Sequence, residues 1–131
     1  MKKLILTSAI LAGLIAGQAI AEEDAGRSEY MIACAGCHGE TAMGDGPLAK
    51  LLNIGTPNLT SLAARNDGKF PYEYTLFMID RRDVIAVHGG DMPVWGDRYT
   101  TSATSQRGET SDMVVRGRIL SLVYYLASIQ Q

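Results

Sequence analysis

Both cysteines of the chain and one of its two histidines lie close together, at Cys34, Cys37 and His38. Three kinds of site use such a spacing: a zinc knuckle, a redox-active dithiol, and two thioether bonds to haem with the histidine on the iron. A structural disulfide is a poor explanation, because a bridge between these two cysteines would close too short a loop to constrain the unfolded chain much.

The rest of the sequence favours the haem interpretation. A zinc site needs about four N or S ligands, and only His88 could complete the set. Cys37 and His38 are adjacent, whereas structural zinc ligands are usually spaced more widely. A thioredoxin-like dithiol normally accompanies a βαβ unit, and no strand alternation is visible. The C-x-x-C-H pattern in an exported chain therefore predicts one covalently attached haem c, with thioethers at Cys34 and Cys37.

We expect residues 1–21 to be a secretory signal peptide and residues 22–131 to be one domain. A positively charged start precedes an uncharged apolar run over residues 4–15, and two small residues, Ala19 and Ala21, follow at the positions that a signal peptidase reads. An uncleaved anchor is the alternative, but the run is shorter than the about 20 apolar residues that span a bilayer comfortably. The mature chain is thus predicted to be periplasmic, without stable insertion into the membrane.

The charge of the chain excludes one class of partner. The formal net charge is −2, and it becomes −4 without the signal, because the 12 basic residues fall to 10 while the 14 acidic residues all remain. This acidity argues against nucleic-acid binding. The remaining chain of about 110 residues is long enough for one domain, and an apolar cofactor would contribute much of the packing in so small a core.

Helices are predicted over residues 24–33, from near Pro71, and from Thr110 or Ser111 to the C-terminus. The polar residues 97–111 are predicted to form a long connection. An apolar stripe at three- and four-residue steps marks the last helix, and it consists of Val115, Ile119, Leu122, Leu126 and Ile129.

Over nearly all of residues 24–131 the chain resembles the class I c-type cytochromes. The resemblance rests on a helix that ends in C-A-G-C-H, on Gly46-Pro47, on Met92-Pro93 followed by Trp95-Gly96, and on the amphipathic C-terminal helix. It implies an all-α cytochrome c fold, with a few helices and long loops around one covalently bound haem.

The resemblance also implies that the first and last helices cross. Gly26 and Tyr30 match one side of the family's crossing, and Leu122 and Tyr125 match the other. A glycine at this point lets the two backbones approach closely.

Met92 is the expected second ligand of the iron, opposite His38. It lies in a loop flanked by glycines, and Pro93 biases it to an extended conformation; the resemblance indicates the same residue. His88 is the alternative, since imidazole also binds haem iron. The other methionines are too near the motif or at helical positions typical of a core: Met31, Met43, Met78 and Met113.

The resemblance implies one further role around the haem, and side-chain chemistry suggests others. Pro47 matches the family proline whose carbonyl accepts a hydrogen bond from Nδ1 of the ligating histidine. Trp95 is a candidate donor to the haem propionates, and so are Tyr72, Arg81 and Arg82, because arginine suits carboxylates.

A haem with imidazole and thioether ligands is six-coordinate and has no open position for a substrate. We therefore expect a periplasmic single-haem electron carrier and not an enzyme. Its partners would be redox proteins, with a dehydrogenase as donor and an oxidase or reductase as acceptor. The alternative is a cytochrome subunit of an oxidoreductase complex or a ligand-binding haem protein, an alternative that the long polar segment 97–111 keeps open.

Overall fold

The computed structural model describes residues 24–53, 55–82, 92–103 and 109–131. These residues are mostly helical and contain no strand, which confirms the predicted all-α class. After a helical stretch over residues 24–33, the helices are α2 (Ala35–His38), α3 (Pro47–Leu52), α4 (Tyr72–Asp80), α5 (Trp95–Ser102) and α6 (Ser111–Ser128).

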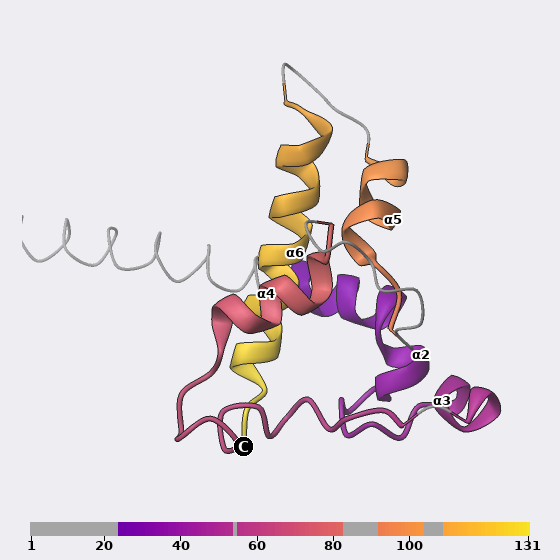
Figure 1. Cartoon of the computed structure of the whole chain (residues 1–131), viewed down its shortest axis with the longest axis vertical. Coiled ribbons are helices and arrows are strands. Elements are labelled where there is room, and N and C mark those ends of the chain that lie inside the picture. The colour runs from indigo at the N-terminus through magenta and orange to yellow at the C-terminus, as the bar shows by residue number, and fades with distance from the viewer. Residues whose placement is uncertain (1–23, 54, 83–91, 104–108) are drawn as a thin grey trace, which may run out of the picture.

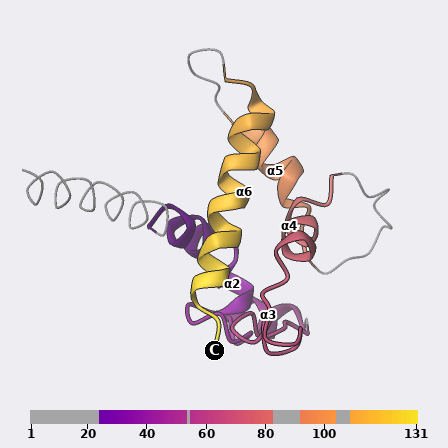
Figure 2. The same ribbon diagram turned by 90° about the vertical axis from the view of Figure 1, so that its left-hand side faces the viewer.

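Helix α6 is the axis of the fold. The first helical stretch, residues 24–33, and α4 both cross it, while α5 lies beside its N-terminal half, as the two views in Figure 1 and Figure 2 show. The predicted apolar stripe is the centre of the core, because Val115, Ile119, Leu122 and Leu126 are all at most 3% exposed. Ile129 follows the end of the helix and packs against the same cluster.

The expected contact between the first and last helices is present. A Cβ atom on Gly26 would overlap the backbone carbonyl of Ser121 and would lie 2.8 Å from Cβ of Tyr125. The rings of Tyr30 and Tyr125 pack with their centroids 5.4 Å apart. Only a residue without a side chain fits at position 26, so this glycine sets how closely the two helices approach.

Helix α4 begins where the sequence predicts, next to Pro71. The carbonyl of Pro71 accepts hydrogen bonds from the backbone N–H and the hydroxyl of Thr75, at 2.9 and 2.8 Å. Pro71 is therefore the residue before the helix rather than its first helical position. Burial of Thr75 and Ile79 turns one side of α4 towards the core.

The prediction of one long connection over residues 97–111 is wrong in its first part. Helix α5 fills that part, and Tyr99, which is 3% exposed, anchors it in the core. The hydroxyls of Thr100, Thr101 and Ser102 donate to carbonyls four residues earlier. Such bonds satisfy polar side chains inside a helix, so their polarity was not evidence of a loop. Residues 104–108 lie outside the described residues.

Polar side chains fix both ends of α6. The hydroxyl of Thr110 accepts from the backbone N–H of Met113 at 3.2 Å, which makes Thr110, one of the two predicted caps, the N-cap. Beyond the C-terminal end, the Gln130 side chain donates to the carbonyl of Leu59 at 2.8 Å and accepts from Ala63 N–H at 2.9 Å. These bonds attach the loop after α3 to the end of the chain.

Among the described residues, no helix combines the length and the apolar character that crossing a membrane would require. The predicted signal peptide, residues 1–21, lies outside the described residues.

We predict that Gly26→Ala lowers the free energy of unfolding by about 2–3 kcal/mol, because the added methyl group overpacks the helix crossing. Guanidinium denaturation of the purified mature protein measures the change. Gly55→Ala is the matched control, since a Cβ there would meet nothing within 4 Å. Equal stability of the two variants would contradict the close approach at Gly26.

Candidate functional site

The two cysteines and the histidine share one face of one helical turn. Cys34 N–H donates to the carbonyl of Tyr30, and His38 N–H donates to the carbonyl of Cys34, both at 2.8 Å. Positions three and four apart lie on the same side of a helix, so Cys37 and His38 both lie beside Cys34. Cys34 is buried, Cys37 is half-buried, and both are free thiols.

His38 is held in a defined orientation. Its Nδ1 lies 3.1 Å from the carbonyl oxygen of Pro57, and because a carbonyl can only accept, Nδ1 carries the proton. The lone pair is then on Nε2. Burial lowers the pKa of His38, and the hydrogen bond to Pro57 opposes this shift without cancelling it. The ring is thus neutral near pH 7 and has one nitrogen able to bind a metal.

The expectation that Pro47 supplies this carbonyl is wrong. Pro47 is the first residue of α3, and the loop after α3 folds back so that Pro57 reaches His38. Leu59 N–H donates to the carbonyl of Ala42 at 2.8 Å, which brings the two segments together. Gly44 has φ 86°, and a Cβ there would overlap the carbonyl of Thr56, so glycine is required for this close approach.

A second buried hydrogen bond fixes the end of the turn. The hydroxyl of Tyr30 donates to the carbonyl of Gly39 at 2.6 Å. Burial, with smaller contributions from Cys34, Tyr125 and Asp45, raises the pKa of Tyr30 well above its ordinary value. The tyrosine is therefore protonated at neutral pH and can donate this hydrogen bond.

The surroundings of Cys34 count against the dithiol alternative. Burial, followed by the neighbouring Glu29 carboxylate and Cys37, raises the pKa of Cys34 to about 12. Reactive dithiols depend on a thiol whose pKa is lowered, since the thiolate is the nucleophile. Burial thus favours the protonated thiol of Cys34 at neutral pH.

A charged cluster that the sequence did not reveal lies beside Cys34. Arg118 donates from two nitrogens to the two carboxylate oxygens of Glu29, at 2.8 and 3.0 Å, and from the third to the Ser102 hydroxyl at 3.0 Å. Its guanidinium carbon lies 4.1 Å from the ring centroid of Tyr99. The cluster joins the first helical stretch, α5 and α6. No local pattern could have shown it, because 89 residues separate Glu29 from Arg118.

Of the other predicted site residues, some pack against the core and others are engaged by neighbouring side chains. Met92 is partly buried and packs against the core cluster, as does Trp95 at the start of α5. Arg82 is already engaged by Asp80, at 2.5 Å, and by Asp112, at 2.8 Å, so it is not a free donor for another carboxylate. Tyr72 contacts Tyr124 on α6, with ring centroids 6.1 Å apart.

Arg81, another predicted donor to the propionates, is the C-cap of α4, with φ 50°.

His88, the alternative iron ligand and the fourth ligand that a zinc site would need, lies outside the described residues. Within the described residues, no three His, Cys, Asp or Glu side chains come together in a way that could hold a metal ion.

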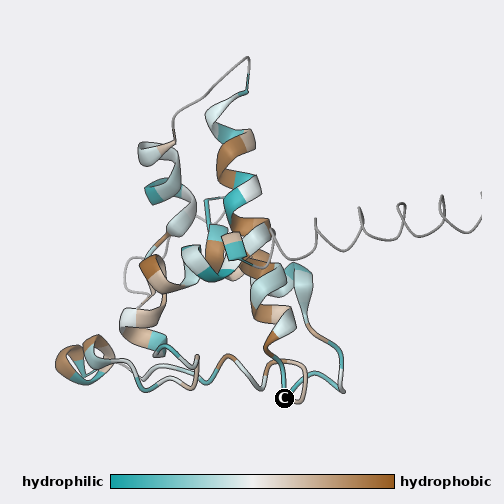
Figure 3. Ribbon diagram, turned by 180° about the vertical axis from the view of Figure 1, so that it is seen from behind, coloured by the Kyte–Doolittle hydropathy of each residue, from teal (hydrophilic) through white to brown (hydrophobic). Residues whose placement is uncertain are grey.

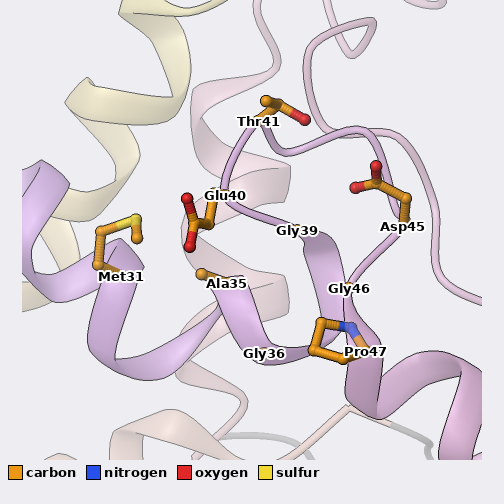
Figure 4. Close-up of a pocket in the computed structure, with 9 residues that line it drawn as sticks. All are labelled: Met31, Ala35, Gly36, Gly39, Glu40, Thr41, Asp45, Gly46 and Pro47. Atoms are coloured by element: carbon orange, nitrogen blue, oxygen red, sulfur yellow. The ribbon is translucent and has the colours of Figure 1, made fainter.

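An open cavity of about 410 Å³ lies on the opposite face of the cysteine turn. Figure 4 shows its lining, which includes Ala35 and Gly36 of α2 and the acidic side chains Glu40 and Asp45. On a helix, positions 35 and 36 point away from positions 34, 37 and 38, so the cavity and the thiol–imidazole face are separate. Cys34, Cys37 and His38, the residues that could hold a cofactor, do not line this cavity.

Comparisons with protein-family models, with curated proteins and with solved structures found no match to this chain.

We predict that Pro57→Gly moves the NMR resonance of the His38 Nδ1 proton, because freeing φ at position 57 lets the carbonyl leave its place 3.1 Å from the ring. Pro47→Gly is the matched control and should leave that resonance nearly unchanged. A larger change in Pro47→Gly than in Pro57→Gly would restore the role first expected of Pro47.

Proposed function

We propose that the protein is a class I c-type cytochrome that carries single electrons between redox partner proteins in the periplasm. The observation that carries this proposal is the orientation of His38: Nδ1 donates to the carbonyl of Pro57, and Nε2 is left to bind iron. The thiols of Cys34 and Cys37 lie on the same helical face. This donor set is the one that c-type haem requires.

The residues present fit one haem c. Cys34 and Cys37 would hold it through two thioether sulfurs, and His38 would bind the iron through Nε2. Once bound, the haem supplies an iron centre that changes between Fe(II) and Fe(III). The Pro57 carbonyl fixes the tautomer of His38 and raises the basicity of the ring, as groups hydrogen-bonded to metal ligands commonly do.

Met92 is proposed as the second residue that would bind the iron, in addition to His38. Its partly buried place beside the core, on the segment that leads into Trp95 and α5, is compatible with that role. A thioether favours Fe(II) and raises the reduction potential. With His38 and Met92 both bound to the iron, the protein would transfer electrons without binding a substrate, so no residue is assigned a catalytic role.

A rigid setting also suits electron transfer. The His38 ring is bonded to Pro57, and Tyr30 is bonded to Gly39 at the end of the same turn. Because both bonds are buried or partly buried, the ligand has little freedom to move when the charge of the iron changes.

The rival function, an oxidoreductase subunit or a ligand-binding haem protein, drew its support from the polar segment 97–111. Helix α5 now occupies the first part of that segment, with Tyr99 in the core. That part contributes to the packing of the domain and needs no partner to explain it. The electron-carrier proposal is therefore the better supported of the two.

We predict that the reduced wild-type protein does not bind carbon monoxide, and that Met92→Ala binds it readily because one axial position has opened. The reduction potential should fall by on the order of 0.1 V, since axial ligands tune haem potentials over about 0.8 V. Visible spectra and a redox titration measure both effects.

Two control variants make this test specific. Met43→Ala removes another methionine, 49% exposed and close to the cysteine turn, and should change neither property. His88→Ala should also leave both unchanged. Carbon monoxide binding by His88→Ala but not by Met92→Ala would show that imidazoles occupy both axial positions.

A further inference from the structure

Helix α6 has a second apolar stripe, on the side away from the core. Met113, Leu120 and Tyr124 are 60%, 39% and 49% exposed, and Gly117 is exposed between them. Steps of four, three and four residues place all four positions on one helical face. Hydrophobic segments recur along the whole of α6 in Figure 3. The core therefore uses only one of the two apolar sides of this helix.

The exposed stripe continues into a groove between α6 and α4. A cavity of about 340 Å³ is lined there by Tyr72 and Leu76 of α4 and by Leu120, Val123 and Tyr124 of α6. Tyr72 is 48% exposed and Leu76 is 36% exposed. Five large half-exposed side chains present on the order of 400 Å² of apolar surface, an extent that marks interaction sites on soluble proteins.

No contact within the described residues explains why position 117 is a glycine. A Cβ at this position would meet nothing within 4 Å, in contrast to Gly26, where a Cβ would overlap a neighbouring backbone carbonyl. Glycine is among the poorest helix formers, and this one lies in the middle of an 18-residue helix. A glycine in an exposed helix face suits the close approach of another chain.

We propose that this face binds a second copy of the protein, with the two α6 helices antiparallel about a two-fold axis between Arg118 and Ile119. Positions equally far from that point then meet: Gly117 faces Leu120 of the second copy, and Met113 faces Tyr124 of the second copy. Each leucine fits over the glycine of the other chain. A two-fold interface needs a surface that is complementary to itself, and this stripe has that property.

The charges around the stripe favour self-association. Asp112 is paired with Arg116 at 2.7 Å and with Arg82 at 2.8 Å, so two copies would not bring unbalanced acids together. Glu73 lines the groove beside Leu120 and forms no ion pair within the described part of the chain. In the antiparallel register it faces Arg116 of the second copy, and charges of opposite sign meet on both sides of the axis.

The available surface is of the size that a dimer needs. A standard interface buries about 800 Å² on each partner, of which somewhat more than half is apolar. The stripe and groove supply most of that apolar share. The inference goes beyond the proposed function and does not depend on it, because no residue of the cysteine turn contributes to this face.

Sedimentation equilibrium of the purified mature protein over a dilution series tests the proposal. We expect a dimer whose dissociation constant rises at least tenfold in Gly117→Leu, because the gap for Leu120 of the second copy is filled. Leucine favours helix more than glycine does, so the variant should keep its helical circular dichroism. Leu120→Glu should dissociate the dimer as well.

Two further variants test whether dimerisation depends on this face in particular and not on exposed apolar residues in general. Exchanging the pair, Gly117→Leu with Leu120→Gly, restores the matching of large and small residues and should recover dimerisation to within tenfold of wild type. Leu51→Glu removes a leucine of α3 that is 78% exposed and should leave the dimer intact. A wild-type protein that is monomeric at all concentrations, or a dimer unaffected by Gly117→Leu and Leu120→Glu, would overturn the proposal.

Discussion

The hydrogen bond between Nδ1 of His38 and the carbonyl of Pro57 is the interaction on which the candidate site depends. Making it requires the chain to turn back on itself, so that a loop 19 residues further on covers the imidazole. Gly44 allows the two segments to touch, and the bond from Leu59 N–H to the Ala42 carbonyl holds them together. Gln130, at the C-terminal end, then fixes Leu59 and Ala63 in place. The orientation of the His38 ring is thus supported by contacts from three distant parts of the sequence.

Helix α6 also determines the position of the candidate site, because it fixes the first helical stretch. The first helical stretch can cross it closely only at Gly26, and this crossing determines where the turn that contains Cys34 begins. The bidentate pair between Glu29 and Arg118 joins the same two segments beside Cys34. Because both side chains are less than a third exposed, the pair is shielded from water better than an ordinary surface ion pair. A domain this small has few other ways to fix its N-terminal helix.

Much of this arrangement was readable in the sequence. The apolar stripe of α6, its Thr110 cap, the start of α4 near Pro71 and the contact between Gly26 and Tyr125 each follow from a local pattern or from the family resemblance, and each is present. Local patterns have clear physical causes, because helix periodicity and capping involve residues only a few positions apart.

The predictions that failed depend on contacts between residues far apart in the sequence, or on hydrogen bonds inside a helix that the residue types alone do not show. Pro47 was expected to supply the carbonyl because it matches the family proline, whereas the fold-back of the loop decides which carbonyl meets the ring. Helix α5 was missed because its hydroxyls bond to its own backbone, and only two apolar side chains, Trp95 and Tyr99, attach this polar segment to the core. The Glu29–Arg118 pair could not be found by spacing at all.

The most direct test of the account is the mass of the purified mature protein and of its peptides. The account predicts one haem per chain that survives denaturation, located on the peptide that contains Cys34 and Cys37, with both sulfurs modified. Replacement of either cysteine by serine should leave a single thioether on the other. A native protein that has unmodified thiols at both positions, or a disulfide between them, would contradict the proposed haem attachment and with it the electron-transfer function.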